Sequence, residues 1–132
     1  MATPDDVQWF GWELHLESGN SDKFYRFLVT LHPDPAAVGL HGKRGDSGQI
    51  GLLKIGTDAN RVISEVIDRT RDKEGKGYWL TRGFTPFTAP AALSDPGSLR
   101  GNAHTLAAHF GRAAVAQGTE EDNPAAIPTR PI

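Results

Sequence analysis

Apolar and polar residues alternate along residues 7–17, VQWFGWELHLE. Three large apolar residues, beginning with Trp12, fall on one side of an extended chain, and the charged positions between them fall on the other. A period of two is typical of a half-buried β-strand. The turn-forming residues 18–22 follow, and residues 23–31, KFYRFLVTL, are rich in aromatic and β-branched side chains. We therefore expect a β-hairpin with residues 23–31 as its second arm.

A second pair of strand-like segments follows Pro33 and Pro35. Proline has no N–H for a β-ladder, so these two residues end the first hairpin. Residues 36–40, AAVGL, lead into the glycine-dense run GKRGDSG at 42–48, and QIGLLKI at 49–55 regains strand character. The pattern predicts a second hairpin with a glycine-rich turn.

The apolar period becomes helical after residue 57. Thr57 or Asp58 can cap a helix, and Gly75 and Gly77 can end it. The apolar residues that share one face of this helix are Val62, Ile63, Val66 and Ile67. Residues 78–80 are typical of a short closing strand. The predicted fold is α+β: an antiparallel β-sheet of about four to five strands with one main amphipathic helix of about four turns packed on it.

The composition shifts after Gly83, because six of the nine prolines lie in residues 84–132. We expect a domain over residues 7–83, a proline-rich connection over 84–117 and a disordered tail over 118–132. Within the connection, apolar residues recur at helical spacing from Ser98 to Gln117, so a second helix is predicted there. The sequence leaves open whether this helix packs on the core.

Length and composition narrow the class of protein. The 132 residues, 38% of them hydrophobic, are enough for one modest core. The chain has no cysteine, which excludes a thiol nucleophile, a disulfide framework and a thiolate metal site. Residues 1–6 are polar and acidic, and no apolar run approaches the roughly 20 residues that span a bilayer. We expect a cytoplasmic protein without a membrane partner.

Charge is unevenly distributed, although the formal net charge is only −2. Residues 1–37 contain two basic and six acidic side chains, whereas residues 38–83 contain nine basic and six acidic ones, a net of +3. A positive field in the middle of the chain favours a polyanionic partner, although an ordinary solvated surface is also compatible with so small an excess.

The glycine-rich turn carries the clearest candidate chemistry. In residues 41–49, HGKRGDSGQ, three glycines bracket Lys43 and Arg44 beside the ring of His41. Glycines allow a backbone to approach a bulky anion, and the cations supply charge, so this loop is a candidate phosphate-binding site. The alternative is a tight hairpin loop whose glycines serve only the turn geometry.

Several segments together resemble the WGR domain, a family found in poly(ADP-ribose) polymerases and in many bacterial proteins. The resemblance covers roughly Trp12 to Trp79 and depends on the order and spacing of five short segments. These are residues 23–26 (KFYR), 41–45 (HGKRG), 48–49 (GQ), 71–73 (RDK) and 77–79 (GYW). The resemblance implies a compact antiparallel sheet with one helix that contacts DNA, notably at strand ends.

The chain departs from the family pattern at its two most characteristic positions. His41 stands where the family has tryptophan, and Lys43 stands where it has arginine, although Arg44 supplies a guanidinium one residue later. Histidine offers less stacking surface than an indole, and lysine lacks the bidentate fork of arginine. Attraction to a phosphate backbone is less affected, because it depends mainly on charge.

The sequence gives little support for a catalytic site or a metal-binding site. Gly45-Asp46-Ser47-Gly48 is similar to the segment around a serine-protease nucleophile, but the chain is too short for that fold. His104 and His109 are five residues apart, which turns them to different faces of a helix. There is no phosphate-binding GxxxxGK[ST] or GxGxxG loop. We expect neither an enzyme nor a metal or cofactor.

The sequence therefore predicts a nucleic-acid-binding module, with DNA (duplex or strand ends) as the partner and contacts to the phosphate backbone. The alternative is a protein–protein interaction module without nucleic-acid binding. Tyr25 is expected to face away from Phe24 and Phe27 and so to offer a surface contact. The predicted nucleic-acid-binding residues are His41, Gly42, Lys43, Arg44, Gly48, Gln49, Lys23, Tyr25, Arg26, Lys73 and Lys76.

Overall fold

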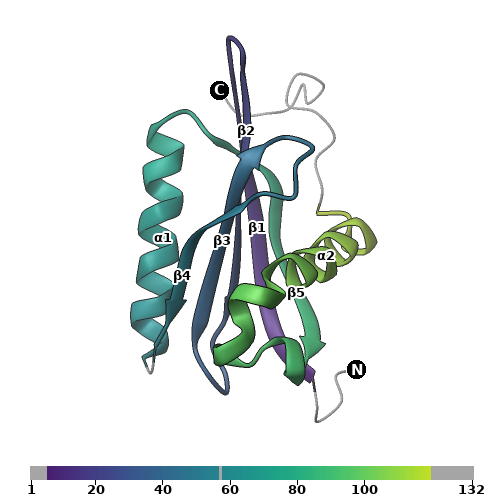
Figure 1. The fold of residues 1–132 in the computed structure, drawn as a ribbon. Coiled ribbons are helices and arrows are strands. Elements are labelled where there is room, and N and C mark those ends of the chain that lie inside the picture. The colour runs from purple at the N-terminus through teal and green to yellow at the C-terminus, as the bar shows by residue number, and fades with distance from the viewer. Residues whose placement is uncertain (1–5, 57, 120–132) are drawn as a thin grey trace.

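The fold was analysed in a computed structural model that describes residues 6–56 and 58–119. Its elements are β1 (Asp6–Ser18), β2 (Ser21–Thr30), β3 (Ala36–Lys43), β4 (Gln49–Ile55), α1 (Ala59–Gly75), β5 (Trp79–Pro90), two short 3₁₀ helices, η1 (Ala91–Leu93) and η2 (Pro96–Ser98), and α2 (Leu99–Gln117). The five strands form one antiparallel sheet in the order β4-β3-β2-β1-β5 (Figure 1). The α+β class, both hairpins and both helices are confirmed.

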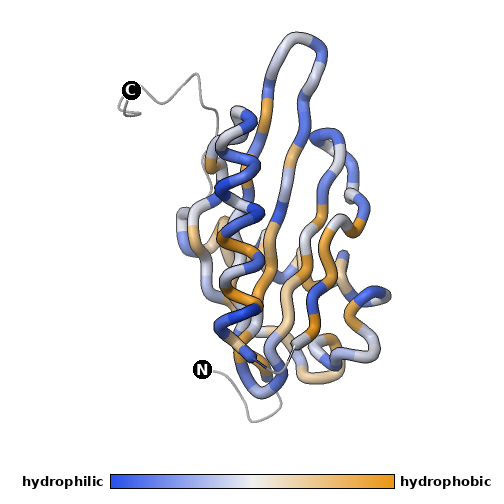
Figure 2. Tube along the Cα trace, turned by 90° about the vertical axis from the view of Figure 1, so that its left-hand side faces the viewer, coloured by the Kyte–Doolittle hydropathy of each residue, from blue (hydrophilic) through white to orange (hydrophobic). Residues whose placement is uncertain are grey.

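The first hairpin projects beyond the rest of the sheet, and its turn is hydrophilic (Figures 1 and 2). β1 and β2 stay in register from Phe10 opposite Val29 to Ser18 opposite Ser21. Gly19 in the turn has a φ of 58°, a left-handed conformation that glycine adopts without steric cost. The turn therefore lies where the sequence predicts it.

β5 is much longer than the short strand expected over residues 78–80. It pairs with β1 from Trp79 opposite His15 to Pro90 opposite Asp6, and so continues past the composition change at residue 83. The sequence predicts a proline-rich connection here rather than a continued strand. Because β5 is an edge strand, Pro86 fits into it without breaking the interior of the sheet.

α1 packs on one face of the sheet. Asp58 caps the helix by accepting a hydrogen bond from the backbone N–H of Asn60 at 2.9 Å. Thr57, the other candidate cap, lies outside the described residues. The helix buries Val62 and Val66. The core on this face contains Leu14, Tyr25, Phe27, Val29, Val62 and Val66.

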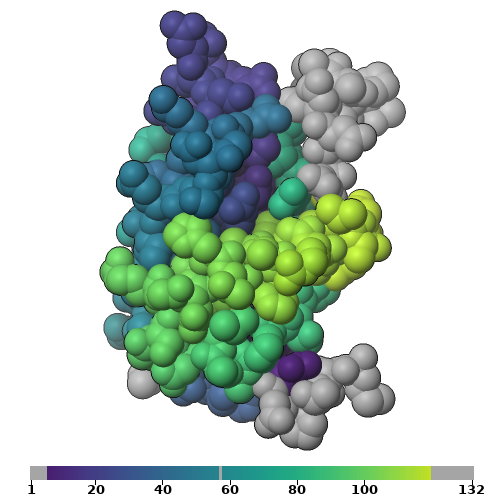
Figure 3. Space-filling model, turned by 45° about the vertical axis from the view of Figure 1, so that its right-hand side comes forward, coloured from purple at the N-terminus to yellow at the C-terminus, as the bar shows by residue number. Residues whose placement is uncertain are grey.

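α2 packs on the opposite face, which answers the question that the sequence left open. It lies across the sheet in Figure 3. Gly11 of β1 permits this close approach, since a Cβ there would lie 2.4 Å from Cδ1 of Phe110. The second core contains Trp9, Phe24, Leu28, Leu40, Phe87, Leu106 and Phe110. No helix among the described residues is long and apolar enough to cross a membrane.

The residues after α2 run along the outer edge of β5. Gly118 ends the helix with a φ of 69°, and the carbonyl of Thr119 accepts a hydrogen bond from the N–H of Gly83 at 3.1 Å. The Thr119 hydroxyl lies 2.6 Å from that of Thr85. Disorder was expected from residue 118 onward. These contacts order Gly118 and Thr119, and residues 120–132 lie outside the described part of the chain.

Candidate nucleic-acid interface

Three lysines from three separate elements converge on one surface pocket. Lys23 of β2 and Lys43 of β3 are direct partners across the strands, and Lys73 comes from the last turn of α1. The pocket has a volume of about 330 Å³. The residues that line it include Lys23, His41, Gly42, Lys43, Lys73 and Tyr78. None of the three ammonium groups forms an ion pair with a carboxylate of the described residues.

Lys73 is held above two aromatic rings. Its ammonium nitrogen lies 4.9 Å from the ring centroid of Tyr25 and 5.7 Å from that of Tyr78, which are cation–π distances. Partial burial lowers the pKa of Lys73, and the neighbouring positive charges, Lys76 first, lower it further. The carboxylate of Asp72 opposes this lowering, and an anion entering the pocket would stabilise the ammonium group in the same way.

A column of stacked rings supports the pocket. His41 stacks on Tyr25 with 5.4 Å between ring centroids and 16° between planes, and Tyr25 stacks on Phe27 at 4.7 Å. Gly51 makes room for this arrangement, since a Cβ there would lie 2.5 Å from Cδ2 of His41. The histidine ring is thereby fixed beside Lys73 rather than free to rotate.

The expected surface role of Tyr25 is wrong. Residues two apart on a strand point to the same face, so Tyr25 lies on the same face as Phe27, and only Phe24 lies opposite. Tyr25 is only 4% exposed. Burial raises the pKa of its hydroxyl, and the charge of Arg69 opposes that rise. The ring supports His41 and Lys73 from beneath and does not itself form a contact surface.

Arg44 is already paired with carboxylates of its own chain. Its Nη1 lies 2.7 Å from Oε1 of Glu17 and 3.5 Å from Oδ1 of Asp22, and its backbone N–H donates to the Asp22 carbonyl. These acidic residues flank the tip of the first hairpin, which lies beside the basic loop. Arg44 is thus neutralised within the chain, whereas no ion pair of the described residues involves Lys43.

The rest of the loop serves turn geometry and packing. Gly45 and Gly48 have φ values of 94° and 91°. The carbonyl of Gly48 is hydrogen bonded to Nε2 of His104 at 2.9 Å, so α2 contacts one side of the loop. Gln49 is exposed at the start of β4, opposite His41 in register. Gly42 is the loop glycine that lines the pocket.

Two further predicted cations lie outside the pocket. Lys76 pairs with Asp72 at 3.2 Å, one helical turn away. Arg26 lies on the opposite face of the sheet, where its Nε donates to Oε1 of Glu13 at 2.6 Å.

Of the eleven predicted residues, the structure gathers five at the pocket, and Tyr78 joins them. Sequence reasoning assigned Tyr78 to a closing strand, although its position just after the helix end indicates that it lies near Lys73.

Glu13 is the centre of a buried ionic network on the α2 face. It is 5% exposed and lies 2.6 Å from Arg26, 2.7 Å from Nε2 of His15 and 3.9 Å from Nη1 of Arg82. Burial alone raises the pKa of Glu13, but the hydrogen bond from His15 and the charge of Arg26 outweigh burial and lower it. The carboxylate thus neutralises Arg26 and stabilises the sheet.

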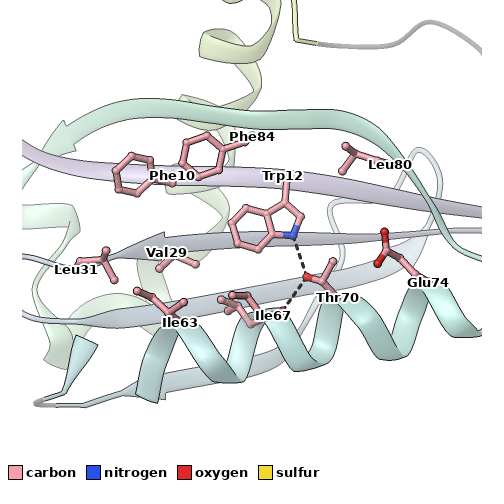
Figure 4. Close-up of a pocket in the computed structure, with 11 residues that line it drawn as sticks. Phe10, Trp12, Val29, Leu31, Ile63, Ile67, Thr70, Glu74, Leu80 and Phe84 are labelled. Carbon is pink, nitrogen blue, oxygen red and sulfur yellow. Dashed lines mark hydrogen bonds between the residues drawn. The ribbon is translucent and has the colours of Figure 1, made fainter. Parts of the chain in front are cut away.

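An apolar groove separates α1 from the β1–β5 side of the sheet (Figure 4). It has a volume of about 550 Å³, and the residues that line it include Phe10, Trp12, Ile63, Ile67, Leu80 and Phe84. The Trp12 indole N–H donates to Oγ1 of Thr70 at 2.9 Å, which ties the floor of the groove to the helix. Phe84 remains 59% exposed. The sequence does not predict this groove, because the domain expected from the sequence ends at residue 83, before Phe84.

Comparisons with protein-family models, with curated proteins and with solved structures found no match for this chain. Among residues 6–56 and 58–119, no group of three or more histidine, aspartate or glutamate side chains is placed to hold a metal ion. The resemblance to the WGR domain therefore stays a prediction, and the case for a function depends on the pocket itself.

Proposed function

We propose that this chain is a non-enzymatic nucleic-acid-binding module that binds the phosphate backbone of DNA through the pocket of Lys23, Lys43 and Lys73. The observation that carries the proposal is the convergence of these three lysines without a carboxylate partner among the described residues. Two neighbouring cations, Arg44 and Lys76, do pair with carboxylates of the chain. Because like charges repel, such a cluster costs stability unless an anion occupies it.

Aromatic rings beside the lysines favour a nucleotide over a small inorganic anion. His41 and Tyr78 both line the pocket, and π faces stack on bases or sugars with little sequence preference. Ammonium groups are point charges that bind phosphate without a fixed geometry. This combination supports binding that depends on backbone charge and is tolerant of base sequence. The WGR-like segments point to the same class of ligand.

The test is fluorescence anisotropy with a labelled short DNA duplex and the matching single strand at low salt. Lys23→Ala, Lys43→Ala and Lys73→Ala are each expected to weaken binding several-fold by removing one phosphate contact. Arg100→Ala is the matched control, because Arg100 is an exposed cation on α2, away from the pocket. The proposal fails if the three lysine variants bind as tightly as the control.

Arg44→Ala separates this pocket from a loop-only site. Because Glu17 and Asp22 already neutralise Arg44, its removal is expected to weaken binding less than Lys43→Ala does. A loop-only site predicts similar losses for these adjacent residues. If no variant of this series binds any nucleic acid even at low salt, and neither does the unmodified chain, the protein-interaction alternative is favoured.

A further inference from the structure

The apolar groove beside α1 lacks a covering element among the described residues. Three of the large side chains that line it stay exposed: Phe84 by 59%, Leu80 by 40% and Ile67 by 39%. Phe84 stacks on Phe10 with 5.0 Å between ring centroids, so the exposed rings form one continuous surface. Contiguous apolar surface of this kind typically marks a binding site.

The described chain ends at the outer edge of β5, the strand that borders the groove. Thr119 is hydrogen bonded to Gly83, the residue before Phe84, on the outer edge of β5. The side-chain amide of Gln117 donates to the Pro86 carbonyl on the same strand. Residues 117–119 thus lie along the strand that borders the groove. Phe84, the residue after Gly83, lines the groove.

The following residues begin with an acidic stretch, Glu120, Glu121 and Asp122, and residues 123–132 contain the apolar and basic side chains that suit the groove. Ile127 and Ile132 are large apolar residues on either side of Arg130, the only cation after Thr119. Among the described residues that line the groove, Glu74 is the only charged one. Ile127 is eight positions after Thr119, a reach of up to about 26 Å at roughly 3.3 Å per extended residue. That length is enough to pass around β5 and enter the groove.

We propose that residues 120–132 bind in the groove of their own chain, with Ile127 against Phe84 and Ile67, and Arg130 beside Glu74. The low apolar content of this segment led to the expectation of disorder, because the segment was considered alone. The groove supplies an apolar surface on which the few apolar side chains of the segment can be buried. The covalent link supplies an effective concentration in the millimolar range, so contacts too weak for a separate peptide suffice. Prolines at 124, 128 and 131 favour extended conformers and reduce the ordering cost.

The absence of cysteine makes a spin-label test direct. A nitroxide is attached to Thr129→Cys in the full chain, and paramagnetic loss of amide NMR signals is measured. The expected result is loss of most signal intensity at Phe84 and Ile67, with little change at Ile55 on the opposite sheet edge. Adding Ile127→Asp is expected to restore the signals. Adding Ala125→Asp, which introduces the same charge without removing an apolar anchor, is expected to leave the loss in place.

Three results would overturn the proposal. One is signal loss spread evenly over the surface or centred elsewhere. Another is loss at Phe84 that persists in the Ile127→Asp variant. The third comes from a mixture of two chains, one isotope-labelled without nitroxide and one spin-labelled without isotope. Signal loss at Phe84 of the isotope-labelled chain would show that the segment of a second copy occupies the groove. The measurement requires no nucleic acid, so its outcome is independent of the function proposed for the lysine pocket.

Discussion

Replacing Glu13 by glutamine should destabilise the fold strongly for an isosteric change. Loss of one partner of a buried ion pair costs about 3–5 kcal/mol. The side chains of Arg26 and Arg82 keep 17% and 22% of their surface exposed. Hydration of these arginines therefore offsets part of the cost of losing the carboxylate. Glutamine also retains the shape and one oxygen acceptor. We expect a decrease of about 2 kcal/mol in the free energy of unfolding at pH 7.

Urea unfolding followed by tryptophan fluorescence measures this decrease. With a slope of about 2 kcal/mol per molar urea, the midpoint should fall by about 1 M. The matched control is Glu17→Gln, because Glu17 also accepts from an arginine at 2.7 Å but its side chain is 51% exposed. Exposed pairs contribute about 0–1 kcal/mol. Equal midpoints for the two variants would refute the assignment of a stabilising role to the buried network.

The pH dependence gives a second readout of the same carboxylate. The pKa of Glu13 in the folded chain lies below its ordinary value of 4.5, because His15 and Arg26 outweigh the effect of burial. A group with a lowered folded pKa stabilises fully above its unfolded pKa, and this stabilisation is lost as the pH falls through the folded value. The stability gap between the original chain and Glu13→Gln should therefore be constant well above pH 4.5 and close below it. A gap that persists in acid would contradict this.

Three further variants test the packing and the site. Gly11→Ala places a Cβ 2.4 Å from Phe110, so we expect a loss of about 1–3 kcal/mol in the free energy of unfolding by urea titration; an unchanged midpoint would show that α2 does not pack this closely. Asp58→Ala removes the cap of α1, and thermal unfolding should show a loss of about 1 kcal/mol, whereas no loss would contradict the capping geometry. Gly51→Ala collides with His41, so the histidine ring resonances should shift and DNA affinity should fall; retention of both would argue against a fixed ring.

The elements whose signals are local could be predicted from the sequence. Alternation predicts β1 and β2, and a period near 3.6 with a cap at Asp58 predicts α1. The length of β5 could not be predicted in the same way. Pro86 and Pro90 exclude an interior strand but not an edge strand, and only the completed sheet order shows which applies. Whether α2 docks depends on the same long-range order.

Some features of the candidate site could likewise be predicted from the sequence, and others could not. Adjacent hairpins make the pairing of Lys23 with Lys43 predictable. The same register places Asp22 beside Arg44, but the ion pair of Arg44 with Glu17 depends on side-chain conformation, which the sequence does not show. Tyr25 is a different case: strand alternation alone places it with Phe27, so that prediction could have been made correctly from the sequence.

The salt dependence of DNA affinity tests the central claim most directly. If Lys23, Lys43 and Lys73 together contact three phosphates, the logarithm of the binding constant should fall with the logarithm of salt concentration at a slope of about −2.7 on duplex DNA. Replacing all three lysines by alanine should bring the slope close to zero, and Arg100→Ala should leave it near the original value. A slope that is the same in the triple variant and the original chain would contradict the account.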